Sequence, residues 1–131
     1  MNLLEQYIIE AEDDARVDEV TIHDKSMKLP SIKHKWVARL INAKRDESKL
    51  IRQKRAAIAD IAVKLKEKGR VNLSDASINA AASKHESISK IQEQIDEYKD
   101  IIEYLEKLER IFSSITWDYK NIVEIMKLET M

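Results

Sequence analysis

Several residue types are missing or scarce in this chain of 131 residues. It contains no cysteine, which excludes disulfides, thiolate metal sites and cysteine nucleophiles and suits a reducing compartment. One glycine and one proline leave almost none of the residues that make tight turns and hairpins. Aromatic residues are only 5% of the chain, which is not the composition of an ordinary compact domain.

Apolar residues never form a long run. The longest apolar stretches have three or four residues, so no membrane-spanning segment is expected. Leu3–Ile9 is interrupted by Glu5 and lacks a basic leader, and we therefore expect no signal peptide. Residues that favour long helices are plentiful instead. The composition indicates an all-α, cytoplasmic protein whose long helices cover their apolar stripes by self-association.

Charge is strongly segregated, although the formal net charge is only −1. Residues 1–24 hold eight acidic side chains and one basic one, and residues 71–131 hold twelve acidic and seven basic. Between them, residues 25–70 hold fifteen basic side chains and four acidic ones. Such a basic stretch is a candidate polyanion surface, because cations that neutralise phosphates release counterions. The alternative is that these cations solvate a long helix and pair with acids of neighbouring subunits.

The N-terminal half is expected to contain a short helix, an irregular stretch and a long helix. Residues 2–12 have an amphipathic pattern, and residues 13–29 are interpreted as irregular. Pro30 suits the first turn of a helix, which then continues to Lys68 and ends at Gly69. The scattered apolar anchors of the irregular stretch are Val17, Val20, Ile22 and Leu29.

The long helix carries two apolar stripes separated by a polar segment. The first stripe is Ile32, Trp36, Leu40 and Ala43. The second stripe is Ala57, Ile58, Ile61, Ala62 and Leu65. Residues 44–49 between them contain no apolar side chain and form either a solvated helix or a hinge. A helix of about 58 Å implies a kink or an extended rod.

The C-terminal part begins with residues 70–77, which are loop-like at least in part. Helix is expected to resume between Ser74 and Ser83, and Ser83 with Glu86 matches a capping box. Beyond it, apolar residues recur at alternating spacings of three and four, as in a coiled coil.

This apolar seam is assigned to oligomerisation. Its spacing skips at Leu108, which indicates either a stammer or a helix break at residues 113–116. More than five heptads rich in isoleucine favour an assembly larger than a dimer. The oligomerisation residues are Ile88, Ile91, Ile95, Tyr98, Ile102, Leu105, Phe112, Ile115, Tyr119, Ile122 and Met126.

Scattered residues along nearly the whole chain resemble one known family. They are Val17-Asp18, Lys35-Trp36, Lys44-Arg45, Gln53-Lys54-Arg55, Tyr119-Lys120-Asn121-Ile122, Glu124 and Lys127-Leu128-Glu129. With these residues the sequence resembles the UvsY-type recombination mediators of T-even-like phages. The motifs are diffuse rather than a sharp signature.

The resemblance implies a non-enzymatic, ring-like homo-oligomer, a hexamer or heptamer, that binds single-stranded DNA. Its implied protein partners are a phage RecA-like recombinase and the phage single-strand-binding protein, and its implied location is the cytoplasm of the infected bacterial host. Family members help the recombinase replace the single-strand-binding protein and form a presynaptic filament. The resemblance implies no cofactor.

One departure from the family affects the candidate DNA site. In the family, a Lys and an Arg two apart in a Leu-Lys-x-Arg-Leu-type segment are linked to DNA binding. The corresponding stretch here, Ile58–Ala62, has no basic residue, so other cations must supply the charge. The candidate DNA-binding residues are Lys33, Lys35, Arg39, Lys44, Arg45, Lys49, Arg52, Lys54, Arg55, Lys64, Lys66, Lys68 and Arg70.

Other chemistry is weakly supported. His23, His34 and His85 are far apart, so no metal site is expected. No phosphate loop, nucleophile elbow or triad is found, and acid clusters such as Asp13-Asp14 are interpreted as solvated faces. Trp36 and Trp117 could stack on bases, but core packing is favoured for both.

Two hypotheses remain. In the first, the chain is a mediator with a DNA-binding part, residues 1–70, and an oligomerisation part, residues 71–131, within one structural unit. In the second, it is a helical scaffolding oligomer whose charge blocks only organise self-assembly. A titration with oligo(dT) at two salt concentrations discriminates between them.

Overall fold

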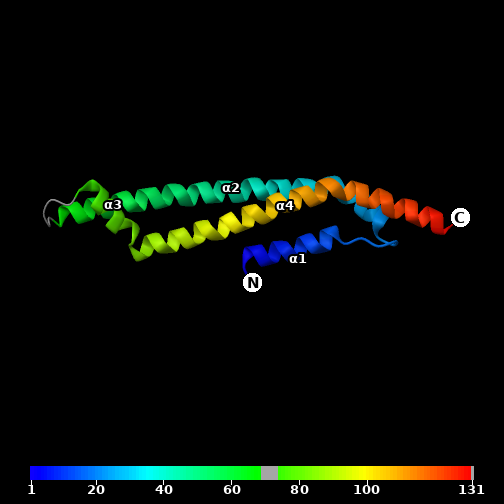
Figure 1. Cartoon of the computed structure of the whole chain (residues 1–131), viewed down its shortest axis with the longest axis horizontal. Helices are drawn as coiled ribbons and strands as arrows, with labels where there is room; N and C mark the ends of the chain where they lie inside the picture. Colours follow the sequence, from blue (N-terminus) through cyan, green and yellow to red (C-terminus); the bar gives the residue numbers. More distant parts are fainter. Residues whose placement is uncertain (69–73, 131) are drawn as a thin grey trace. The chain divides into compact units, whose positions relative to one another are not determined.

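The computed structural model describes residues 1–68 and 74–130, and this part of the chain is almost entirely helical. Four helices follow one another: α1 (Leu3–Ala15), α2 (Ile22–Glu67), α3 (Asp75–Ser83) and α4 (Glu86–Glu129), as Figure 1 shows. The described residues contain no strand. The all-α prediction is therefore confirmed. The predicted helix end at Gly69 and the candidate cation Arg70 lie outside the described residues.

Helix α1 agrees with the amphipathic segment predicted at residues 2–12 and continues to Ala15. Its N-terminus is capped by Asn2, whose Oδ1 accepts the N–H of Glu5 at 2.8 Å. An Asn at this position satisfies one of the N–H groups that a helix leaves without a partner.

The start of α2 corrects the prediction for residues 13–29. This stretch is irregular only at 16–21, and residues from Ile22 onward are helical. Asp18 explains the early start, because its Oδ1 accepts the N–H groups of Val20 and Thr21, both at 2.9 Å. The Thr21 hydroxyl in turn accepts the N–H of Asp18 at 3.0 Å. These reciprocal bonds support a helix start before Pro30.

Pro30 therefore lies inside α2, and its predicted place in the first turn is wrong. A proline in a helix interior removes one backbone hydrogen bond and costs about 3 kcal/mol. Ile22 and Leu29 are both buried, so the turns before the proline are held by packing that offsets this cost. Val20, by contrast, is 89% exposed and anchors nothing.

Both long helices continue through the segments where a break was an open question. Helix α2 is uninterrupted at residues 44–49, and α4 is uninterrupted at residues 113–116. Two serines of α4 are accommodated by bonding back to the helix: Ser113 donates to the carbonyl of Glu109, and Ser114 donates to that of Ile111. Such bonds satisfy the hydroxyls without ending the helix.

The predicted capping box at Ser83 and Glu86 is wrong. Ser83 is the last residue of α3, and its hydroxyl donates to the carbonyl of Asn79. The start of α4 is capped instead by His85, whose Nδ1 accepts the N–H of Ser87 at 3.2 Å. Helix does resume within the expected range, because Ser74 caps α3.

The chain packs as two compact units, and both α2 and α4 contribute to each. The first is Met1–Asn42 with Asp100–Met131, and the second is Ala43–Lys99. The predicted division of roles at residue 70 does not follow this boundary and stays a prediction about function.

The two cores differ in the size of their side chains. The first unit buries Ile32, Trp36 and Leu40 of the first predicted stripe together with large residues of α4, and Trp36 is only 3% exposed. The α4 residues buried there are Ile101, Leu105, Leu108, Phe112, Ile115 and Tyr119. The second unit buries smaller side chains, namely Ala43, Ala62, Ile78, Ala82, Ile88 and Ile95. Much of the seam assigned to oligomerisation is thus covered within a single chain, and its role in assembly stays a prediction.

Candidate nucleic-acid interface

The candidate DNA-binding cations lie along α2, apart from Lys68, which follows its end, and Arg70. In the structure, some of these cations are bonded to other side chains of the chain and others are not. This division matters because a cation that is bound to a carboxylate must leave it before it can neutralise a phosphate.

Two cations of the first unit are held by acids of α1. Lys35 Nζ lies 2.6 Å from Asp14 Oδ2 and 3.2 Å from Glu10 Oε1, and the guanidinium of Arg39 pairs with Glu10 Oε2. The indole N–H of Trp36 also donates to Asp14 Oδ2, at 2.9 Å. We call Glu10, Asp14, Lys35, Trp36 and Arg39 the α1–α2 charge cluster.

The charge cluster lowers the pKa of Glu10 and covers much of the Asp14 side chain. The hydrogen bond from Arg39 holds the pKa of the Glu10 carboxyl below its usual value; burial opposes this effect, and the hydrogen bond from Lys35 adds to it. The pair Asp13-Asp14 was interpreted as a solvated face, but the Asp14 side chain is only 15% exposed. Asp14 is thus a largely covered acceptor that holds two donors of α2.

Cations of the second unit are partly engaged as well. Lys54 Nζ donates to Gln92 Oε1 at 2.6 Å, and Lys66 Nζ pairs with Asp75 Oδ1 at 2.9 Å. Lys44 also has a partner. These three are therefore poorer candidates for phosphate contact than the sequence suggested.

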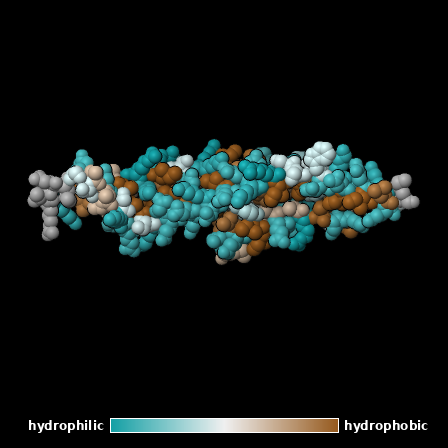
Figure 2. All heavy atoms as spheres, in the orientation of Figure 1, coloured by the Kyte–Doolittle hydropathy of each residue, from teal (hydrophilic) through white to brown (hydrophobic). Residues whose placement is uncertain are grey.

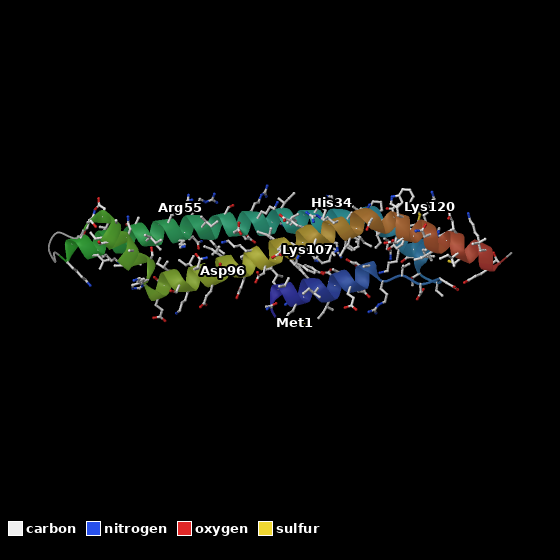
Figure 3. All side chains as sticks on the ribbon, in the orientation of Figure 1. Met1, His34, Arg55, Asp96, Lys107 and Lys120 are labelled. Atoms are coloured by element: carbon white, nitrogen blue, oxygen red, sulfur yellow. The ribbon has the colours of Figure 1, made fainter. Side chains whose placement is uncertain are left out.

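Four other cations of the second unit are exposed, and none has an ion pair or hydrogen bond to another described residue. They are Arg45, Lys49, Arg52 and Arg55, which we call the outer basic face. At 3.6 residues per turn, spacings of four, three and three keep them within about a third of the helix circumference and within about 15 Å along the axis. Figure 3 labels Arg55, which projects from α2.

The sequence around the outer basic face strengthens its positive potential. No acidic residue occurs from Ser48 to Ala59, a stretch that holds three of the four cations. Lys49 is the least favourable member, because it borders a groove that Asp46 and Glu97 also line. Among the other candidate cations without a partner in the described residues, Lys64 and Lys68 fall outside this sector of the helix by their spacing, and Lys33 lies about three turns before Arg45, in the first unit.

The two tryptophans have different environments. Core packing is confirmed for Trp36, whose ring meets that of Tyr7 edge-on at 5.6 Å. It is wrong for Trp117, which is 66% exposed, with Lys120 Nζ 5.2 Å from the ring centroid. The apolar spacing of α4 misled the prediction, because Trp117 lies beside the buried seam and not on it.

Trp117 belongs to a set of apolar side chains of α4 that the single chain leaves exposed. The largest of them are Ile111, Trp117, Ile125 and Leu128. Figure 2 shows hydrophobic side chains in several patches on the face viewed, one of which follows the last turns of α4. Exposed apolar side chains that adjoin one another are typical of an interaction surface, so this part of α4 is a candidate for one.

No group of three or more potential metal ligands exists in the part of the chain that the structure describes. Within the same residues no helix is both long and apolar enough to cross a membrane. The geometry thus defines a class: an all-helical protein with a free cationic face on one helix and a second group of cations held by its own acids.

Comparison with known proteins identifies the family. Residues 10–130 match the model of the family described as recombination, repair and ssDNA binding protein UvsY, and the chain belongs to this family. A search of curated protein sequences finds no match. Among solved structures, the fold is similar to the crystal structure of the bacteriophage T4 recombination mediator protein UvsY. The TM-score is 0.79 over 98% of this chain and 99% of that chain, and the sequence identity is 15%.

Proposed function

We propose that this chain binds single-stranded DNA through the outer basic face and acts as a recombination mediator. In this role it loads a RecA-like recombinase onto DNA coated with single-strand-binding protein, in the cytoplasm of the infected bacterial host and without hydrolysing nucleotide itself. The observation that carries the DNA part is the set of four exposed cations, Arg45, Lys49, Arg52 and Arg55, in a member of the UvsY family. The description of the family as ssDNA-binding supports single-stranded DNA as the ligand.

The expected mode of binding is electrostatic. Flexible arginine and lysine side chains contact phosphates and leave the bases unread, so the affinity is nearly independent of sequence. The outer basic face carries no aromatic ring, and stacking on bases therefore contributes little there.

Self-association would multiply this modest contact. We propose that chains assemble into a closed ring of six or seven through the exposed apolar side chains of α4, together with the partly covered positions of the predicted seam. Several outer basic faces on one strand then bind with an avidity that a single face cannot supply.

A titration with labelled oligonucleotides tests the DNA part. The protein is expected to bind oligo(dT) and mixed-sequence single strands equally, to bind duplex more weakly, and to lose affinity steeply as salt rises. Absence of binding at low salt would leave a helical scaffold as the better interpretation.

The mediator part requires the cognate recombinase and single-strand-binding protein. On coated single strands, the chain is expected to shorten the lag before recombinase ATPase begins. An unchanged lag with intact DNA binding would reduce the function to passive DNA binding.

A further inference from the structure

The α1–α2 charge cluster has the composition of an occupied anion site. Asp14 Oδ2 accepts from both Lys35 Nζ and Trp36 Nε1, and Glu10 accepts from Lys35 and Arg39. Two carboxylates therefore satisfy three donor side chains of α2, and both come from one short helix. The same donors, a guanidinium, an ammonium and an N–H, are those that recognise phosphate oxygens.

The helix that supplies these carboxylates buries little apolar surface beside its polar contacts. Ala11 is its one buried residue, while Ile8 and Ile9 are exposed. Tyr7 of α1 also meets the Trp36 ring edge-on. Ion pairs that are partly open to water are weakened by salt and can be exchanged for pairs with another polyanion. The phosphates of a DNA strand could therefore replace the carboxylates of α1 as partners of these cations and release the helix.

The residues beneath α1 combine charge with aromatic surface. The guanidinium of Arg39 lies 4.7 Å from the Trp36 ring centroid and 4.9 Å from that of Tyr7, and Lys35 Nζ lies 5.2 Å from Trp36. Cations next to an indole are the parts of a site for single strands, in which phosphates pair with the cations and a base stacks on the ring. The outer basic face has no such ring.

One further polar group of the first unit, the Tyr119 hydroxyl, has no hydrogen-bond partner among the described residues. Tyr119 of α4 is 5% exposed, and its buried hydroxyl makes no hydrogen bond within the described structure. Its pKa is raised by burial and by the charge of Asp14, which places the hydroxyl within electrostatic reach of that carboxylate. A buried hydroxyl without a partner is costly, so an additional acceptor at this position would be favourable.

We propose that Lys35, Trp36 and Arg39 form a second binding site for single-stranded DNA, in which Glu10 and Asp14 now occupy the places of two phosphates. The strand displaces α1, which stays tethered through residues 16–21, and the released carboxylates return when the strand leaves. The inference rests on the proposed DNA-binding function. It adds a second site, separate from the outer basic face, at which the carboxylates of α1 compete with the phosphates of the strand.

Removal of the competing charges tests the site. The variant Glu10→Gln with Asp14→Asn keeps the shapes of the side chains but removes both negative charges and replaces one acceptor oxygen of each carboxylate by an amide donor. Two or three partly exposed ion pairs no longer have to be broken, so this variant should bind oligo(dT) about tenfold more tightly at low salt, a gain equal to about 1.4 kcal/mol. The matched control is Glu5→Gln with Asp13→Asn, which removes the same charge from α1; neither side chain has an ion pair within the described residues, and Lys25 bonds only the backbone carbonyl of Asp13. The control should gain much less.

A fluorescence readout reports on the site itself. In a Trp117→Phe background Trp36 is the one tryptophan of the chain. Oligo(dT) should quench its emission, and quenching should begin at lower oligonucleotide concentration in the charge-removed variant. Far-ultraviolet circular dichroism checks that every variant keeps its helices, and the single change Glu10→Gln repeats the test with less disturbance.

A further pair of substitutions assigns the gain to these cations. Adding Lys35→Ala and Arg39→Ala to the charge-removed variant should abolish the tenfold gain. Adding Arg52→Ala should lower the affinity for oligo(dT) but leave the gain from charge removal in place. Equal gains in the charge-removed and control variants, or Trp36 emission that DNA does not change, would overturn the second site while the outer basic face stands. If neither wild type nor any variant binds oligo(dT), the proposed function fails as well.

Discussion

Replacing Phe112 by alanine is expected to destabilise each chain strongly, whereas replacing Trp117 by alanine is expected to leave chain stability nearly unchanged. The two aromatic residues are five positions apart on α4, but Phe112 is 2% exposed and Trp117 is 66% exposed. Truncating a buried phenylalanine costs about 3–5 kcal/mol, while exposed positions usually change stability by about 0.5 kcal/mol or less. The contrast separates the core of the chain from its surface.

Urea unfolding followed by circular dichroism measures the difference. With a denaturant slope of about 2 kcal/mol per molar, a loss of about 4 kcal/mol lowers the midpoint by about 2 M. The shift for Phe112→Ala should be the same at low and high protein concentration, because this side chain is buried within its own chain. Trp117→Ala should instead reduce the molar mass of the assembly measured by light scattering.

Two results would refute this reasoning. If Phe112→Ala lowers stability only at concentrations where the wild type self-associates, the seam is buried between chains and not within one. If Trp117→Ala destabilises as much as Phe112→Ala, its ring is covered in solution by the chain itself.

Three further outcomes are expected. Pro30→Ala should raise the free energy of unfolding by about 2 kcal/mol, because the helix regains one hydrogen bond, and a lower urea midpoint would contradict the helical placement of Pro30. The pKa of Glu10 is lowered by its hydrogen bond with Arg39, so the contribution of this carboxylate to stability is present above pH 4.5 and is lost as pH falls through the pKa of the folded state. The variant Glu10→Gln should therefore flatten the fall in urea midpoint below pH 4.5. An unaltered pH profile would count against the ion pair. Lys54→Ala should change the salt dependence of oligo(dT) binding less than Arg55→Ala, because the Lys54 ammonium already donates to a glutamine of α4.

Parts of the fold that depend on periodicity were predictable from the sequence. The stripe from Ile32 to Ala43 is buried as expected, and the long C-terminal helix follows its apolar spacing. The buried position near the skip is Ile101 rather than Ile102, a shift of one residue that a small change in helix phase produces. Periodicity identifies a face well but not the residue at its edge.

Local polar signals and contacts between distant segments were harder to predict. The start of α2 depends on hydrogen bonds between Asp18 and Thr21, whereas Pro30, the residue from which the start was predicted, lies inside the helix. The basic block was visible in the composition, but its division into free cations and cations held by Glu10 and Asp14 was not. That division depends on how α1 packs on α2, more than 20 residues away in sequence.

The central claim, that the outer basic face binds single-stranded DNA, is tested most directly by the salt dependence of oligo(dT) affinity in Arg52→Ala with Arg55→Ala. Each lost phosphate contact should reduce the slope of log K against log salt by about 0.7, so this variant should lose about 1.4 from the slope. The matched control, Lys90→Ala with Lys107→Ala, removes two exposed cations that pair with acids one turn away and should keep the wild-type slope. A wild-type slope in the arginine variant, or an equal loss in both variants, would contradict the claim.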